Sequence, residues 1–222
     1  PFFRQWVAFD RTLNNETYQL PRLYPTPETH NYGISIVTHG SKQPFSATAT
    51  NTIPCLHLIG SDTTAFLGRC RYEQRSNEPT LLDDPMDGTW TRSSNLNAAA
   101  IGRFQTELGD DITDDAVFYY VYGALHSPEF RQRYKSNLKK EAPRVPMPPD
   151  WAVFDAYSNA GAELMELHIG YETIEPYPLE EHWSQGADPG VNPKVLRVGD
   201  KKMRYPKVTD PETGTKVTDR TQ

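Results

Sequence analysis

The chain has 222 residues, of which 36% are hydrophobic, 11% aromatic and 23% charged, with a formal net charge of −6. This is the composition of a globular domain, and no apolar run approaches the roughly 20 residues that span a bilayer. Its two cysteines, Cys55 and Cys70, cannot form a disulfide framework, which favours a reducing, cytoplasmic setting.

The two ends of the chain resemble internal segments of a longer polypeptide. The first residues, PFFRQWVAFD, contain neither a starting Met nor a signal-peptide pattern. The last residues, TGTKVTDRTQ, end on a polar, strand-like stretch without a closing element. We therefore expect the chain to be a fragment.

Residues 1–92 carry the signals of β-structure. Short β-branched or aromatic runs at 5–10, 32–39 and 52–60 predict strands. The pieces between them are rich in turn residues. Residues 73–90 are polar and rich in Pro, Gly and Asp, so we expect a long loop there.

Residues 93–170 carry helical signals. Ser93 and Ser94 can cap a first helix, and Thr113 precedes two carboxylates that suit the positive end of a second helix. The second helix carries one apolar stripe at positions i, i+3, i+4, i+7 and i+8, which predicts one buried face. The stripe consists of Val117, Tyr120, Val121, Ala124 and Leu125.

The next helix begins at a serine-proline pair. Ser127 can cap it, and Pro128 stands at the first helical position, where its missing N–H costs nothing. A buried face repeats every fourth residue, formed by Phe130, Tyr134 and Leu138. After a proline-rich break, Asp150 can cap a last helix that runs to about residue 170.

Residues 171–222 return to strand-like pieces, with a hairpin predicted over 194–206 and its turn at Gly199 and Asp200. The sequence thus predicts an α+β fold: a β-rich N-terminal half over 1–92, a helical second half over 93–170, and a short β-rich C-terminal segment over 171–222.

Charge is unevenly distributed along the chain. Residues 128–144 and residues 194–222 each carry a net charge of +4. Because the whole chain carries −6, the other residues together carry −14. Such polarity suits a protein with one face toward a polyanion. It also fits two ordinary solvated faces, and the sequence alone does not separate these interpretations.

The sequence predicts neither a catalytic residue nor a metal site. It contains no P-loop, no dinucleotide-binding loop, no NPPY-like tetrapeptide of adenine methyltransferases and no Gly-x-Ser-x-Gly elbow. The acidic cluster at 109–115 is explained by the helix that follows it. Cys55, His57 and Cys70 match no zinc-finger spacing. Three of the six histidines, His126, His168 and His182, have no evident serine or cysteine partner, so we expect helix-end or surface roles for them rather than a catalytic triad.

The stretch VYGALHSPEFRQRYKSNLKKEAPRVPMP, residues 121–148, closely resembles a segment of the single-polypeptide type I (type ISP) restriction-modification enzymes. The opening PFFRQWVAFD and residues 20–60 also resemble that family's specificity region. The resemblance covers nearly the whole chain. It implies that residues 1–222 are a fragment of a target-recognition domain that follows an adenine methyltransferase domain in a bacterial cytoplasmic enzyme.

The resemblance implies double-stranded DNA as a partner, together with the methyltransferase and helicase domains of the same polypeptide. The fragment itself would need no cofactor, whereas the full-length enzyme would use S-adenosylmethionine, ATP and Mg. Within this reading, Lys42, Arg69 and Arg71 lie in or beside loops and are candidates for base contacts. Four residues of the basic helix are candidates for phosphate contacts: Arg131, Arg133, Lys139 and Lys140.

Two other functions stay open. The chain could be an interdomain docking module whose basic helix packs on an acidic neighbour without touching DNA. It could also be a separate hydrolase with an unrecognised site. Salt distinguishes DNA binding from docking, because the affinity of a phosphate-binding protein for DNA falls steeply as salt rises.

Overall fold

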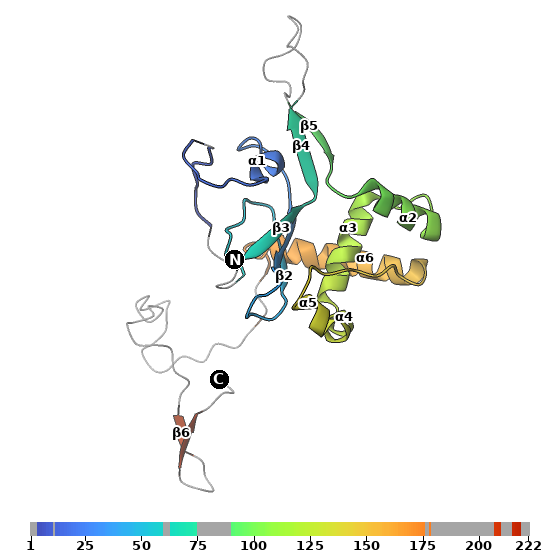
Figure 1. Cartoon of the computed structure of the whole chain (residues 1–222). Helices are drawn as coiled ribbons and strands as arrows, with labels where there is room; N and C mark the ends of the chain where they lie inside the picture. Colours follow the sequence, from blue (N-terminus) through green and yellow to red (C-terminus); the bar gives the residue numbers. More distant parts are fainter. Residues whose placement is uncertain are drawn as a thin grey trace, which may run out of the picture. The chain divides into compact units, whose positions relative to one another are not determined.

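The computed structural model describes residues 4–10, 12–59, 63–74, 90–175, 178, 207–209 and 215–218. The chain divides into two units, residues 1–174 and 175–222. The first unit combines antiparallel strands with helices (Figure 1), which confirms the predicted α+β class. In the second unit, β6 (Lys207–Thr209) pairs antiparallel with β7 (Lys216–Thr218). The hairpin predicted over 194–206 lies outside the described residues.

A three-stranded sheet in the order β2-β1-β3 forms one layer of the first unit. β1 (Gly33–Val37) is buried along its whole length and pairs antiparallel with β2 (Ala47–Thr50) and β3 (Thr64–Gly68). The strand predicted over 32–39 is therefore confirmed. The predictions over 5–10 and 52–60 are wrong, because the described residues of those segments form no strand. A strand needs a hydrogen-bonded neighbour, and β1 takes its neighbours from elsewhere in the chain.

β4 (Cys70–Gln74) and β5 (Trp90–Ser94) form a separate antiparallel ribbon, in which Cys70 lies opposite Ser94. The predicted capping role of Ser93 and Ser94 is therefore wrong, since both belong to β5. The first long helix is capped instead by Asn97, whose Oδ1 accepts a hydrogen bond from the Ala99 N–H at 2.9 Å. Residues 75–89 of the predicted loop lie outside the described residues.

The helices are α1 (Leu20–Leu23), α2 (Ala98–Leu108), α3 (Asp114–His126), α4 (Pro128–Arg133), α5 (Lys135–Leu138) and α6 (Trp151–Ile169). Three predicted caps are confirmed, because side chains of Thr113, Ser127 and Asp150 accept hydrogen bonds from the first turns of α3, α4 and α6. The helix expected after Ser127 divides at Tyr134 into α4 and α5. No helix among these is long and apolar enough to cross a membrane, over the residues that the structure describes.

α3 lies at the centre of the first unit and belongs to both hydrophobic clusters. One side of α3 packs against Ile34 and Ile36 of the sheet and Met165 of α6. Its other side packs against Phe104 of α2 and Phe154 of α6. The expectation of one buried stripe is therefore incomplete: α3 buries two. The sheet-facing stripe consists of Phe118, Tyr122 and Leu125, and the second includes Val117 and Tyr120.

The two longest helices, α3 and α6, approach each other most closely at a pair of glycines. A Cβ on Gly161 would overlap the backbone oxygen of Tyr119, and one on Gly123 would overlap that of Tyr157. Only residues without a side chain allow this backbone contact. The crossing of the two helices is visible in Figure 1.

A buried arginine links the strands to the start of α3. Arg69 lies between β3 and β4, and its side chain is 7% exposed. Its Nε donates to Oδ1 of Asp115 at 2.6 Å, and its Nη1 donates to Oγ of Ser94 at 3.1 Å. The Tyr32 hydroxyl donates to the same Asp115 oxygen at 3.1 Å. Strand, ribbon and helix are therefore joined by one polar cluster.

Gly161→Ala should lower the free energy of unfolding by about 1–3 kcal/mol, the usual cost of overpacking. The matched control is Gly102→Ala in α2, where an added Cβ meets no atom within 4 Å. That change should raise the free energy of unfolding by about 0.5–1 kcal/mol through helix propensity. Denaturant melts of both variants measure the difference, and equal effects would contradict the close helix contact.

Arg69→Met should lower the free energy of unfolding by about 1.5–3 kcal/mol, because Asp115 loses a charge-assisted hydrogen bond. Arg71→Met is the control. Its side chain is 51% exposed and pairs with Glu73 at 3.6 Å, so its loss should cost less than about 1 kcal/mol. Chemical denaturation tests the pair, and a smaller loss for Arg69→Met than for Arg71→Met would refute the linking role.

Candidate nucleic-acid interface

The exposed basic residues of the stretch 128–144 lie on α4 and α5 and in the residues that follow α5. They are Arg133, Lys135, Lys139, Lys140 and Arg144. The Ser127 cap and Pro128 fix the start of α4, and the buried Phe130 and Leu138 anchor the two helices to the core. This confirms the predicted buried face, in which Tyr134 is half-buried. Because those anchors point inward, the basic side chains are left on the solvent side.

The loop between β1 and β2 lies against the same helices. The N–H of Gly40 donates to the carbonyl oxygen of Lys139 at 3.0 Å, and Gly40 has a φ of 80°, a conformation that glycine adopts readily. The structure thereby brings the loop of Lys42 next to the end of α5. We define the basic cluster as five exposed residues: Lys42, Arg133, Lys135, Lys139 and Lys140.

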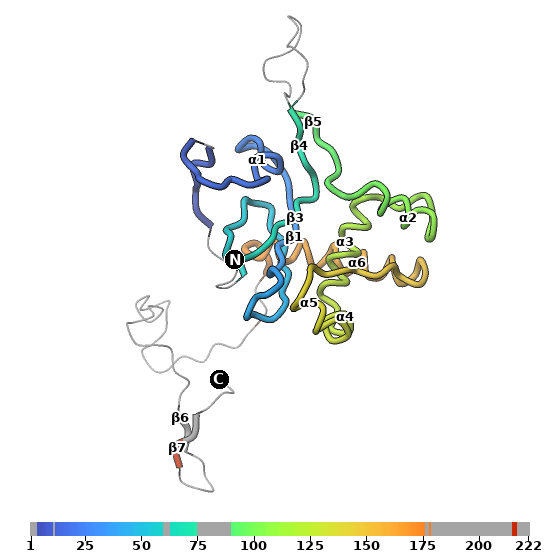
Figure 2. Tube along the Cα trace, in the orientation of Figure 1, coloured from blue at the N-terminus to red at the C-terminus, as the bar shows by residue number. Residues whose placement is uncertain are grey.

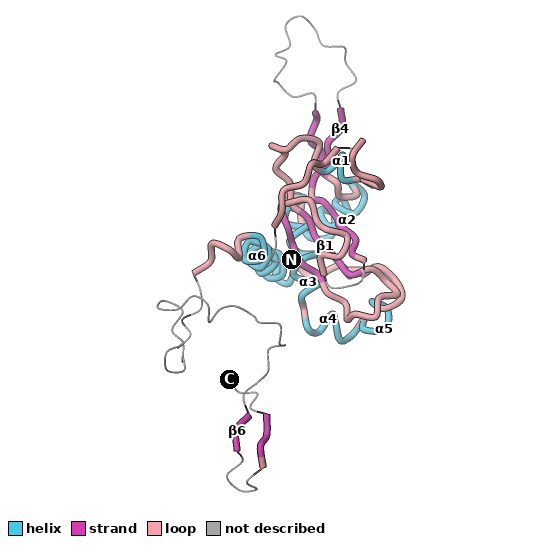
Figure 3. Tube along the Cα trace, turned by 90° about the vertical axis from the view of Figure 1, so that its left-hand side faces the viewer, coloured by secondary structure: helices cyan, strands magenta, loops and turns pink. Residues whose placement is uncertain are grey.

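The opposite end of α3 is acidic. Asp114 and Asp115 occupy its first turn, and Asp110 and Asp111 precede it. Thirteen residues of helix separate the two ends, about 20 Å at 1.5 Å per residue. α2 and the α4–α5 pair lie at opposite ends of α3 in both Figure 2 and Figure 3. The first unit thus carries an acidic end and a basic end.

Arg131 was expected among the phosphate contacts, and the structure places it at the end of α3 instead. Its Nε donates to the carbonyl oxygen of Leu125 at 2.7 Å, and its guanidinium lies over the ring of Phe45. It thereby binds a carbonyl that the end of the helix leaves without a partner. Burial lowers the pKa of Arg131, and the side chain is half-buried.

The two arginines expected to read bases have different surroundings. Arg69 is buried, with its guanidinium bound by Asp115 and Ser94, so this structure does not present it to base edges as expected. Arg71 is exposed, and it lies in strand β4 rather than in a loop. The sequence between residues 68 and 77 has polar residues throughout, and nothing in it marks which arginine faces inward.

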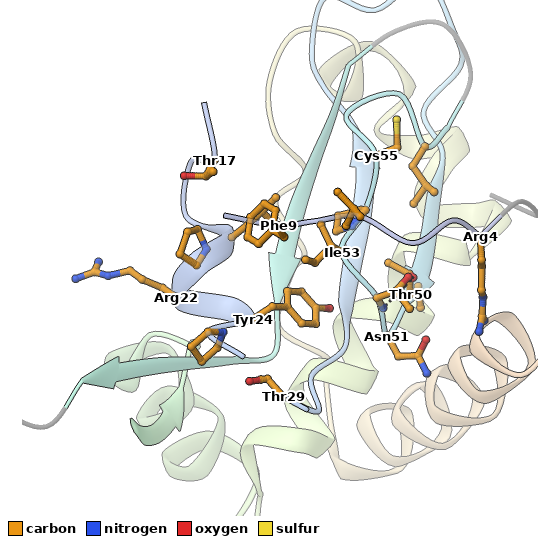
Figure 4. Close-up of a pocket in the computed structure, with 18 of the residues that line it drawn as sticks. Arg4, Phe9, Thr17, Arg22, Tyr24, Thr29, Thr50, Asn51, Ile53 and Cys55 are labelled. Atoms are coloured by element: carbon orange, nitrogen blue, oxygen red, sulfur yellow. Dashed lines mark hydrogen bonds between the residues drawn. The ribbon is translucent and has the colours of Figure 1, made fainter. Parts of the chain in front are cut away.

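A hollow of about 1770 Å³ lies between the N-terminal segment, residues 4–29, and residues 46–55. Figure 4 shows Phe9, Tyr24 and Ile53 around it. Tyr24 is buried, and its hydroxyl has no hydrogen-bond partner. The sequence did not predict this hollow, because its walls come from turn-rich segments without a regular apolar period.

The candidate zinc ligands Cys55, His57 and Cys70 do not form a metal site in the described part of the chain. Cys55 is exposed, and Cys70 is buried. Among the described residues, no group of three His, Cys, Asp or Glu side chains is placed to hold a metal ion.

Known proteins with similar sequence or structure point to one family. A DrdV–DNA complex solved by cryo-EM is 33% identical, covers 78% of this chain and 15% of its own, and has a TM-score of 0.63. A nuclease-deletion mutant of the Type ISP restriction-modification enzyme LlaGI, in complex with a DNA substrate mimic, is 28% identical over 77% of this chain and 13% of its own, with a TM-score of 0.57.

A third structure shares the fold at lower identity. It is the ATP-dependent Type ISP restriction-modification enzyme LlaBIII bound to DNA, 22% identical over 79% of this chain and 10% of its own, with a TM-score of 0.62. None of the curated protein sequences is similar to this chain. The chain thus spans no more than 15% of the length of these three solved proteins.

The family model described as the Type ISP C-terminal specificity domain matches residues 1–221. It covers the sheet, the helices around α3 and the second unit alike. By this match, the chain belongs to the family of Type ISP C-terminal specificity domains.

Proposed function

We propose that this chain recognises the DNA target sequence of a restriction-modification enzyme, and that the basic cluster faces the duplex. The proposal rests on the contact between the loop that contains Lys42 and the backbone of Lys139. This contact gathers positive charge at one end of the first unit, whereas the opposite end of α3 is acidic. Similar chains solved with DNA support the same class of ligand. An overall charge of −6 is compatible with this function, because only the basic end approaches the phosphates.

The residues of the basic cluster lie on two kinds of structure: short helices with the residues beside them, and a loop. Arg133, Lys139 and Lys140 stand on or beside short helices, where a charged side chain reaches phosphates without reading sequence. Lys42 stands in a loop held by the end of α5, and a loop fixed on a rigid scaffold can enter a groove and contact base edges. We therefore assign phosphate contacts to the first three and base readout to the loop of Lys42.

We further propose that the chain acts within a larger enzyme. In that assembly an adenine-N6 methyltransferase part would use S-adenosylmethionine on an adenine extruded from the duplex. Helicase and nuclease parts would use ATP and Mg. The role of this chain would be to hold the duplex in register for them, and no catalytic step is assigned to its own residues.

An interdomain docking module is the second candidate. The basic cluster could bind an acidic surface of a neighbouring part instead of DNA. The two functions differ in one property, because phosphate binding releases counterions and docking to a fixed partner does not involve duplex DNA at all. Affinity for a duplex, measured at several salt concentrations, therefore separates them.

Lys140→Gln should weaken binding to all duplexes alike and reduce the slope of log affinity against log salt by about one unit. Arg103→Gln is the matched control. It also removes one positive charge, but Arg103 lies on α2 beside Glu107, away from the basic cluster. Fluorescence anisotropy with the whole chain and labelled duplexes at several salt concentrations measures both slopes.

A change in sequence preference caused by Lys140→Gln would contradict its assignment to a phosphate. An equal loss of slope in Arg103→Gln would show that net charge, rather than the basic cluster, sets the affinity. The absence of duplex binding at every salt concentration would favour the docking function.

A further inference from the structure

Three nitrogen-bearing side chains that are not part of the basic cluster line the wall of the hollow. His126 comes from the end of α3, Arg131 from α4 and His168 from α6, and all three line the hollow. The imidazole ring centroids lie 5.4 Å apart. The proposed DNA interface uses none of the three for base or phosphate contact, so their meeting is unexplained.

The hydrogen bond between Arg131 and His126 fixes where the proton of His126 lies. Nη2 of Arg131 is 3.3 Å from Nδ1 of His126. Arginine can only donate, so Nδ1 must accept, and a neutral imidazole then carries its proton on Nε2. That Nε2 is buried without a hydrogen-bond partner. His126 therefore has a buried N–H donor that lacks an acceptor.

The same reasoning applies to His168. The Tyr122 hydroxyl lies 2.5 Å from Nδ1 of His168. Because a phenol is a stronger acid than a neutral imidazole and the imidazole nitrogen is the stronger base, the hydroxyl donates this hydrogen bond. Nδ1 accepts, and the proton of the neutral ring again lies on Nε2. In both imidazoles the N–H donor is thus Nε2.

Two N–H donors beside a guanidinium select the chemistry of a ligand. A metal ion needs an unprotonated ring nitrogen, and the charge of Arg131 repels cations. A ligand that accepts hydrogen bonds and carries negative charge satisfies all three groups. We propose that His126, Arg131 and His168 form a binding site for a phosphate-type oxyanion, independent of the basic cluster.

The electrostatics of the site agree with this chemistry. Burial, with the charge of Arg131 and the neighbouring His168, lowers the pKa of His126 to about 4, and burial also lowers the pKa of His168. Both rings are therefore neutral near pH 7, which the donor assignments require. A bound anion would favour the protonated rings and raise both pKa values, so the affinity for an anion of fixed charge should rise only as the pH falls toward these lowered pKa values.

The test is ¹H–¹⁵N NMR of the histidine rings in the whole chain, titrated with inorganic phosphate against chloride at the same ionic strength. We expect Nε2–H tautomers for both rings before phosphate is added. Saturating phosphate should shift their signals and raise the pKa of His126 by about one unit. The exposed His30 and His57 serve as internal controls that should show no saturable shift.

A second titration identifies the source of the oxyanion. If duplex DNA displaces inorganic phosphate from the two histidines, the ligand is a backbone phosphate. If phosphate binds and DNA does not compete, the ligand is free phosphate, and the site stands even where the proposed DNA recognition fails. An Nδ1–H tautomer at either ring would overturn the proposal, as would shifts no larger than those of the two controls.

Discussion

The close contact between α3 and α6 is the constraint on which the rest of the first unit depends. At Gly123 and Gly161 the two helices approach until backbone meets backbone. This approach leaves α3 enclosed, with the sheet on one side and α2 on the other. Because α3 is buried on two faces, the side chains on those faces are apolar or aromatic. Its charged residues lie at its ends.

Those two ends give the unit its electrical polarity. Asp115 at the first turn of α3 binds Arg69 and so holds the strands, while Arg131 binds a carbonyl at the last turn. Both arrangements place charge of the sign that the helix dipole favours. The exposed Lys135, Lys139 and Lys140 then follow on α5 and directly after it, near the positively charged Arg131. One helix therefore sets both the packing of the core and the surface that we assign to DNA.

The local features were predictable from sequence, and the long-range ones were not. The caps at Thr113, Ser127 and Asp150 follow from side chains that reach only a few residues along the chain. The pairing of β1 with residues 47–50 depends on partners that the sequence does not mark, and their Ala-Thr alternation is a weak strand signal. In the candidate site, the burial of Arg69 could not be read from a polar stretch, because its acidic partner lies 46 residues away.

Amide hydrogen exchange of the whole chain, with and without a duplex at low ionic strength, tests most directly which surface meets DNA. The account predicts that DNA slows exchange in the loop of residues 38–43 and in α4 and α5. Exchange in α2 and in the first turn of α3 should stay unchanged. Slower exchange confined to α2 and the acidic end of α3, with none in the basic cluster, would contradict it.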